Sequence, residues 1–307
     1  MLTRSLALIF ALLLAAASLF SCTGSTVHPA GKPVAVATIF SYYDALRAIG
    51  GDKITAVILL PARQSPHEFA ASARNRDDVE AAKLVVKNGL GIDDWVDALI
   101  GSKKPIVLTI GTDASVLKTD EIPLDDATTK HEAESVAGNP HVWLDPLVQI
   151  HAAEKIRDAL SAIDPADQAT FDANAAKYIT DIKALDTEFL AAAKTFAHKD
   201  FVGFHSAYAY LARHYGLRQV ASIEEVPEAG LNAKQIDKVI AIIKKDHIPA
   251  VFAESALGGD APKRIAEETS AKLGVLQPLE TYDDAAKDSY VSLMRQNLES
   301  LKNALGQ

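Results

Sequence analysis

Short apolar runs alternate with helical segments along most of the chain, and this alternation constrains the fold more than any other feature. Strands are predicted at 34–37, 54–60, 84–86 and 106–108, and then at 201–204, 219–223, 250–253 and 274–276. Helices are predicted at 42–49, 77–82, 93–100 and 147–163, and then at 207–215, 231–245, 262–273 and 289–305. Short buried strands that alternate with helices are typical of parallel sheets covered on both faces.

One segment interrupts the alternation. Residues 165–198 contain no glycine, their only proline is at the start, and their large apolar residues recur at helical spacing. This segment is predicted to be one helix on the order of 45–50 Å long. Its position between two αβ halves favours a stiff connector over a simple surface helix. We therefore predict an α/β fold of two similar lobes with parallel sheets, 33–164 and 199–307, joined by one long rigid helix.

The first residues indicate export. Arg4 precedes an apolar run from Leu6 to Ala17, which is shorter than the roughly 20 residues that a membrane-spanning helix needs. The run ends near Cys22, the single cysteine of the chain, and the residues before it resemble a bacterial lipoprotein signal. We predict a signal peptide over 1–21, lipid on Cys22 and a tether over 22–32. An ordinary secretory signal is the alternative. In both cases the protein is exported, to the periplasm or the cell surface.

Composition and missing motifs exclude several function classes. The formal net charge of −9 argues against nucleic acid as a partner. The sequence contains neither a phosphate-binding P-loop nor the GxGxxG pattern, and no GxSxG nucleophile elbow. Nothing in these patterns predicts an enzyme.

Four candidate metal ligands follow predicted strands. Ligands of open parallel sheets bind beyond the carboxyl ends of the strands, and His67, His141, His205 and Glu280 all fall at such places. Three imidazoles and one carboxylate suit Zn²⁺, with Mn²⁺ as the alternative. Two prolines flank His141 in the stretch 139–146, which makes a positioned side chain more plausible there.

Other residues leave the assignment open. Asp283 and Asp284 compete with Glu280 as fourth ligand. Asp145 is predicted to cap the helix after it, and Glu254 to orient an imidazole. His28 lies in the predicted tether, and the histidines on or at the ends of predicted helices are expected to be solvated or capping; these are His151, His198, His214 and His247. His131 belongs to the acidic stretch 113–138, which is predicted to be a solvated loop.

Several motifs of the chain are typical of one known family; they are Ser65-Pro66-His67, Asn88-Gly89-Leu90-Gly91, the stretch Asn139 to Pro146, Phe204-His205-Ser206-Ala207-Tyr208, Glu254, and the ending from Asp288 to Leu298. In these motifs the chain resembles the ZnuA/TroA-like (cluster A-I) metal-binding lipoproteins of bacterial ABC importers. The resemblance implies that His67, His141 and His205 are metal ligands in an interlobe cleft. The ending Pro278-Leu279-Glu280 is similar to that of zinc-type members.

The resemblance implies a monomeric solute-binding protein that captures zinc and hands it to a membrane permease, with ATP hydrolysed by a separate subunit. A manganese or iron binder of the same family is one alternative. A zinc hydrolase belongs to a different class, and its metal would keep a position open for water. A surface adhesin built on the same fold is a third possibility.

Overall fold

The structure is a computed structural model that describes residues 31–102, 104–114, 138–224, 233–254 and 260–306. The predicted signal peptide, Cys22 and nearly all of the acidic stretch 113–138 lie outside the described residues. Within the described ranges, no helix combines the length and the apolar character needed to cross a membrane.

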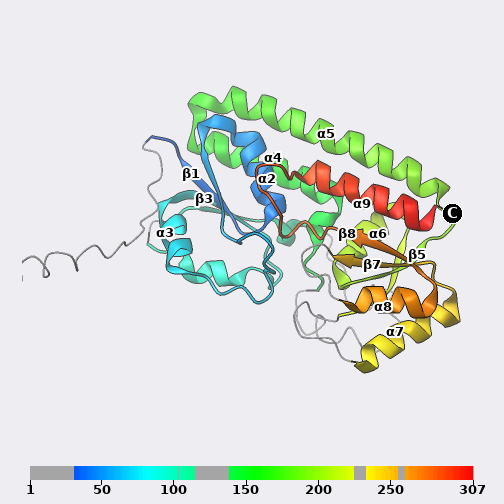
Figure 1. The fold of residues 1–307 in the computed structure, drawn as a ribbon. Helices are drawn as coiled ribbons and strands as arrows, with labels where there is room; N and C mark the ends of the chain where they lie inside the picture. The colour runs from blue at the N-terminus through cyan, green and yellow to red at the C-terminus, as the bar shows by residue number, and fades with distance from the viewer. Residues whose placement is uncertain (1–30, 103, 115–137, 225–232, 255–259, 307) are drawn as a thin grey trace, which may run out of the picture.

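The first half of the chain forms a four-stranded parallel sheet (Figure 1). Its strands are β1 (Val34–Ala37), β2 (Thr55–Ile58), β3 (Ala82–Lys87) and β4 (Ile106–Thr109), in the spatial order β2-β1-β3-β4. The helices of this half are α2 (Phe40–Gly50), α3 (Ala73–Ala81) and α4 (Pro146–Ile163). Alternate residues of β1 face opposite sides: Ala35 packs in the same core as α2 and α4, whereas Val36 packs with α3.

The second half repeats this arrangement. Its strands are β5 (Asp200–Gly203), β6 (Arg218–Ser222), β7 (Ala250–Glu254) and β8 (Lys272–Leu276), in the spatial order β6-β5-β7-β8. Its helices are α6 (Ala209–Tyr215), α7 (Ala233–Asp246), α8 (Asp260–Thr269) and α9 (Tyr290–Leu305). One face of the sheet packs on α7 and α8, and the other joins the core that includes α9. The two sheets therefore have the same strand order.

A long helix, α5 (Gln168–Thr195), runs along both halves with α9 beside it (Figure 1). Its 28 residues correspond to about 42 Å. Its buried side chains, from Phe171 to Phe189, contribute to one apolar core that also contains residues of both sheets. The prediction of two parallel-sheet lobes joined by one long helix is confirmed. The exact domain limits, 33–164, 165–198 and 199–307, stay a prediction.

Several predicted helices were wrong in detail. The segment 93–100 forms a 3₁₀ helix, Asp94–Leu99, and a 3₁₀ turn, Ser206–Tyr208, precedes α6. The helix predicted at 262–273 ends at Thr269, because Ser270 has a φ of 61° and reverses the chain direction. Leu273 consequently belongs to β8. Alanine and leucine favour helices locally, so the pattern alone did not reveal this break.

The chain segment after β8 returns to the first lobe. The backbone N–H of Phe40, at the start of α2, donates to the carbonyl of Glu280 at 2.9 Å. The indole of Trp143 donates to the carbonyl of Pro278 at 2.8 Å, and the hydroxyl of Tyr290 donates to the carbonyl of Trp143 at 3.0 Å. These hydrogen bonds fix the backbone around Glu280 against residues of the first lobe.

Candidate metal centre

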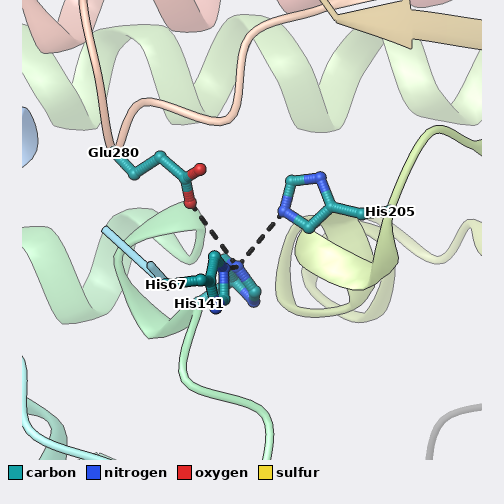
Figure 2. A group of neighbouring side chains, drawn as sticks. All are labelled: His67, His141, His205 and Glu280. Atoms are coloured by element: carbon teal, nitrogen blue, oxygen red, sulfur yellow. Dashed lines mark hydrogen bonds and ion pairs between the residues drawn. The ribbon is translucent and has the colours of Figure 1, made fainter. Parts of the chain in front are cut away.

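Four side chains from four separate segments converge on one point (Figure 2). One ligand atom from each of His67, His141, His205 and Glu280 lies within 4.8 Å of every other. Nε2 of His141 is 3.3 Å from Nε2 of His67 and 3.2 Å from Nε2 of His205. It is also 3.5 Å from Oε2 of Glu280. His67 and His141 come from the first lobe, and His205 and Glu280 follow strands of the second.

These distances match the spacing of ligands around one small cation. Zinc bonds to nitrogen and oxygen are roughly 2.0–2.2 Å, so the edges of a tetrahedral site are about 3.3–3.6 Å. The three distances that join His141 to the other ligand atoms fall between 3.2 and 3.5 Å. The donor atoms of His67, His205 and Glu280 therefore lie around Nε2 of His141 at the spacing that a tetrahedral ion requires, and all four donor atoms lie within 4.8 Å of one another.

The hydrogen bonds of the Nδ1 atoms of His141 and His205 determine which nitrogen of each imidazole carries the proton. The amide of Asn139 donates to the carbonyl of Ser206 at 3.0 Å, so its Oδ1 accepts from Nδ1 of His141 at 2.9 Å. Nδ1 of His205 donates to Oε1 of Glu254 at 2.5 Å. A neutral imidazole carries one N–H, so both Nε2 atoms present lone pairs. Two facing acceptors cannot bond each other, whereas a cation between them satisfies both.

The position of His141 follows from its local sequence. Oδ1 of Asn139 also accepts from the backbone N–H of His141 at 3.0 Å, which closes an Asx turn. A 3₁₀ turn, Val142–Leu144, follows, and Asp145 then caps α4 by accepting from the backbone N–H of Leu147 at 2.9 Å. The predicted helix start at Asp145-Pro146 is confirmed. His141 is fully buried at the end of this stiff segment.

The position of His205 follows from two neighbouring strands. His205 lies two residues after β5, and Glu254 is the last residue of β7, the strand beside β5. Parallel strands bring their carboxyl ends to one edge, so the carboxylate meets the imidazole there. The hydroxyl of Tyr208 also lies 3.0 Å from Oε1 of Glu254. Glu254 thus orients an imidazole, as the sequence predicted.

Glu280 is buried, with 1% of its surface exposed. Its backbone is fixed by Phe40, as described above, and the hydroxyl of Ser41 donates to the carbonyl of Leu279 at 2.7 Å. Leu279 has a φ of 59°, which turns the chain just before Glu280. Among the described residues, Oε2 of Glu280 has no hydrogen-bond partner. A buried carboxylate oxygen that points at imidazole lone pairs is a fitting metal ligand.

His67 differs from the other three because it lies in a loop and is only partly buried. Burial lowers its pKa to about 3, although the carboxylate of Glu280 opposes the shift. Burial also lowers the pKa of His141 well below its usual value, and the neighbouring His205 contributes to that effect. Both imidazoles are therefore neutral near pH 7, which is the form that binds metals.

The alternative fourth ligands lie elsewhere. Oδ1 of Asp283 accepts from Nε of Arg63 at 2.8 Å, and Asp284 pairs with Lys287 at 2.9 Å. Neither belongs to the cluster of four ligand atoms. Arg63 is 220 residues from Asp283, so this pairing had no local signal in the sequence.

Two other expectations need correction or addition. His214, expected to be solvated or capping, is mostly buried and lies 2.8 Å from Oδ1 of Asp186 and 3.4 Å from Oδ1 of Asp145. The role of Asn139 as acceptor for His141 was not predicted. Its signal was available, since Asn before proline commonly starts an Asx turn. His28 and His131 lie outside the described residues.

Comparisons with known proteins agree with this arrangement. A family described as "Zinc-uptake complex component A periplasmic" matches residues 35–304. The zinc-binding lipoprotein AdcA of Streptococcus pneumoniae is 31% identical over 283 residues, which cover 90% of this chain and 56% of that protein. This chain therefore spans little more than half the length of that relative. The high-affinity zinc uptake system protein ZnuA of Bacillus subtilis is 26% identical over 300 residues, covering 96% of this chain and 94% of ZnuA.

A solved structure shows the same fold. The Zn(II)-bound ZnuA-like domain of Streptococcus pneumoniae AdcA superimposes with a TM-score of 0.75 at 30% identity, covering 90% of this chain and all of that domain. The family match extends over most of the chain, from β1 to the last turn of α9. The chain belongs to the family of zinc-uptake complex component A, as its motifs predicted.

Proposed function

We propose that this protein is the extracytoplasmic solute-binding component of an ABC transporter, which captures Zn²⁺ and delivers it to a membrane permease. The observation that carries the proposal is the convergence of three imidazole nitrogens and one buried carboxylate oxygen within 4.8 Å of one another, with Nε2 of His141 3.2–3.5 Å from the other three. The names of relatives at 31% and 26% identity, a zinc-binding lipoprotein and a zinc uptake protein, support it.

Zinc is favoured over manganese by the donor set. Manganese prefers oxygen ligands, whereas three nitrogens and one oxygen suit zinc, which also binds such sites more tightly in the ordinary stability order. The test is a competition titration of the metal-free protein with Zn²⁺ and Mn²⁺. We expect one tight site that zinc occupies preferentially. A preference for manganese would instead support the manganese or iron alternative.

The proposal includes no catalysis. A catalytic zinc keeps one position open for water, whereas here a fourth protein donor, Glu280, lies 3.5 Å from Nε2 of His141 and within 4.8 Å of the donor atoms of His67 and His205. We propose that His67, His141, His205 and Glu280 hold the ion as cargo and that release depends on the permease. An assay of hydrolysis by the zinc-loaded protein should therefore give no turnover above free zinc.

We further propose that lipid on Cys22 attaches the mature protein to a membrane. The signal-like sequence before Cys22 supports this, and the relative from Streptococcus pneumoniae is named a lipoprotein. Mass spectrometry of the protein expressed with its own signal should find lipid on an N-terminal Cys22. A mature N-terminus well beyond Cys22 would refute the assignment.

A further inference from the structure

Two buried carboxylates, not one, lie at the proposed metal site. Glu280 and Glu254 each have only 1% of their surface exposed. Among the described residues, neither forms an ion pair with a lysine or an arginine; their only ionic partners are His141 and His205. Each also keeps one oxygen, Oε2, without a described hydrogen-bond partner. Buried carboxylates without a cation are costly, and a cation held between the imidazoles would offset that cost for this pair.

The two carboxylates act on the same point in different ways, Glu280 directly and Glu254 through an imidazole. Oε2 of Glu280 faces Nε2 of His141 directly, at 3.5 Å. Oε1 of Glu254 accepts the Nδ1 proton of His205, whose Nε2 faces the same centre. An imidazole that bonds a carboxylate through one nitrogen is a stronger base at the other, so the charge of Glu254 acts on the ion through the ring.

The acceptor behind His141 is neutral by comparison. Oδ1 of Asn139 fixes the same tautomer at a similar distance, 2.9 Å, without adding charge. Orientation of an imidazole thus does not require a carboxylate at this site. The carboxylate behind His205 differs from the amide behind His141 because it adds one negative charge to the site.

From these contacts we infer that Glu254 determines specificity for divalent ions, because its charge and that of Glu280 together balance a charge of +2. This inference rests on the proposed metal-binding function and assigns the charge preference of that site. A charge interacts twice as strongly with a divalent as with a monovalent ion at the same distance. Loss of the Glu254 charge should therefore weaken divalent binding more than monovalent binding.

The experiment compares Zn²⁺ and Ag⁺ affinities of wild-type protein and the Glu254→Gln variant by competition titration. Ag⁺ serves as a monovalent probe that imidazoles bind. We expect the ratio of Zn²⁺ to Ag⁺ affinity to fall at least tenfold in Glu254→Gln. Tyr208→Phe is the matched control, because it removes the hydroxyl that contacts Oε1 of Glu254 and leaves the charge. Its ratio should stay within threefold of wild type.

Equal losses for both ions in Glu254→Gln would overturn the inference, since mere misplacement of His205 weakens both alike. If Glu254→Gln does not fold by circular dichroism, Asn139→Asp gives the reverse test. It adds a charge behind His141, so the ratio should rise, and an unchanged ratio would contradict the inference. Weak zinc binding by the wild-type protein would refute the proposed function itself, which separates the two failures.

Discussion

The loop that carries His67 and the turn that carries His205 each present one nitrogen to the proposed metal site, but they hold it in different ways. His205 is fully buried, lies two residues after β5 and is held by Glu254 at 2.5 Å. His67 lies nine residues after β2, is partly exposed, and no described residue forms a hydrogen bond with its Nδ1. Its ring lies against the other two imidazoles.

The difference teaches that two of the three imidazoles are oriented before an ion arrives, whereas the third is not. Ligands with supporting hydrogen bonds need no reorientation on binding, and such partners are worth about 10–100-fold in metal affinity. His205 and His141 have them, through Glu254 and Asn139. The imidazole of His67 has no such partner at Nδ1 among the described residues.

The largest expected effect is on zinc affinity, and it is tested by comparing two single substitutions. His205→Ala removes a preorganised nitrogen and should lower zinc affinity by more than about 100-fold. His67→Ala removes a less firmly held nitrogen and should cost less. Titration against a chelator of known affinity measures both. Equal losses would remove the distinction between the two segments.

The substitutions His205→Ala and His67→Ala should also differ in how much they lower the stability of the metal-free protein. His205→Ala leaves the buried Oε1 of Glu254 without its imidazole partner, which should lower the free energy of unfolding by about 1–3 kcal/mol. His67→Ala leaves no such group and should change it by about 0.5 kcal/mol or less. Urea denaturation at pH 7 checks this. A larger loss for His67→Ala would indicate that its loop is structurally required.

The pH dependence of stability sharpens the comparison. The pKa of His67 falls to about 3 on folding, so between its ordinary value near 6.5 and 3 the unfolded chain binds more protons. The contribution to stability is fully present above about pH 6.5 and is lost as the pH falls toward 3. Each such histidine should add at most about 1.4 kcal/mol per pH unit to the slope. In His67→Asn the slope should be shallower, and an unchanged slope would contradict the assignment.

The smallest expected effect concerns Asp145. This carboxylate caps α4 and lies near His214, so Asp145→Ala should cost about 1 kcal/mol of stability. Metal affinity should fall much less than in His141→Ala, because Asp145 is absent from the ligand cluster. Thermal denaturation and zinc titration of both variants provide the check. Equal loss of zinc affinity in folded Asp145→Ala would make Asp145 a ligand.

Much of this arrangement was predictable because it depends on local patterns. Apolar runs and their alternation with helices predict parallel sheets, and the carboxyl ends of parallel strands predict where ligands gather. That reasoning selected His205, two residues beyond β5, without any tertiary information. The stiff segment around His141 was likewise visible from Asn139 to Pro146.

The rest depended on partners distant in sequence. The proposal of Glu280 over Asp283 as fourth ligand is supported by Arg63, which binds Asp283, and by Phe40, which fixes the backbone of Glu280. His214 was misassigned because its partner Asp186 is 28 residues away, on the long helix. Periodicity describes one segment at a time, so it does not report such pairs.

A zinc-loaded crystal structure, with the metal identified by anomalous scattering at the zinc edge, tests the central claim most directly. The account predicts one Zn²⁺ bound by Nε2 of His67, His141 and His205 at roughly 2.0–2.1 Å and by Glu280 oxygen at roughly 2.0–2.2 Å. Zinc bound elsewhere, or zinc with Asp283 or only water in the place of Glu280, would contradict it.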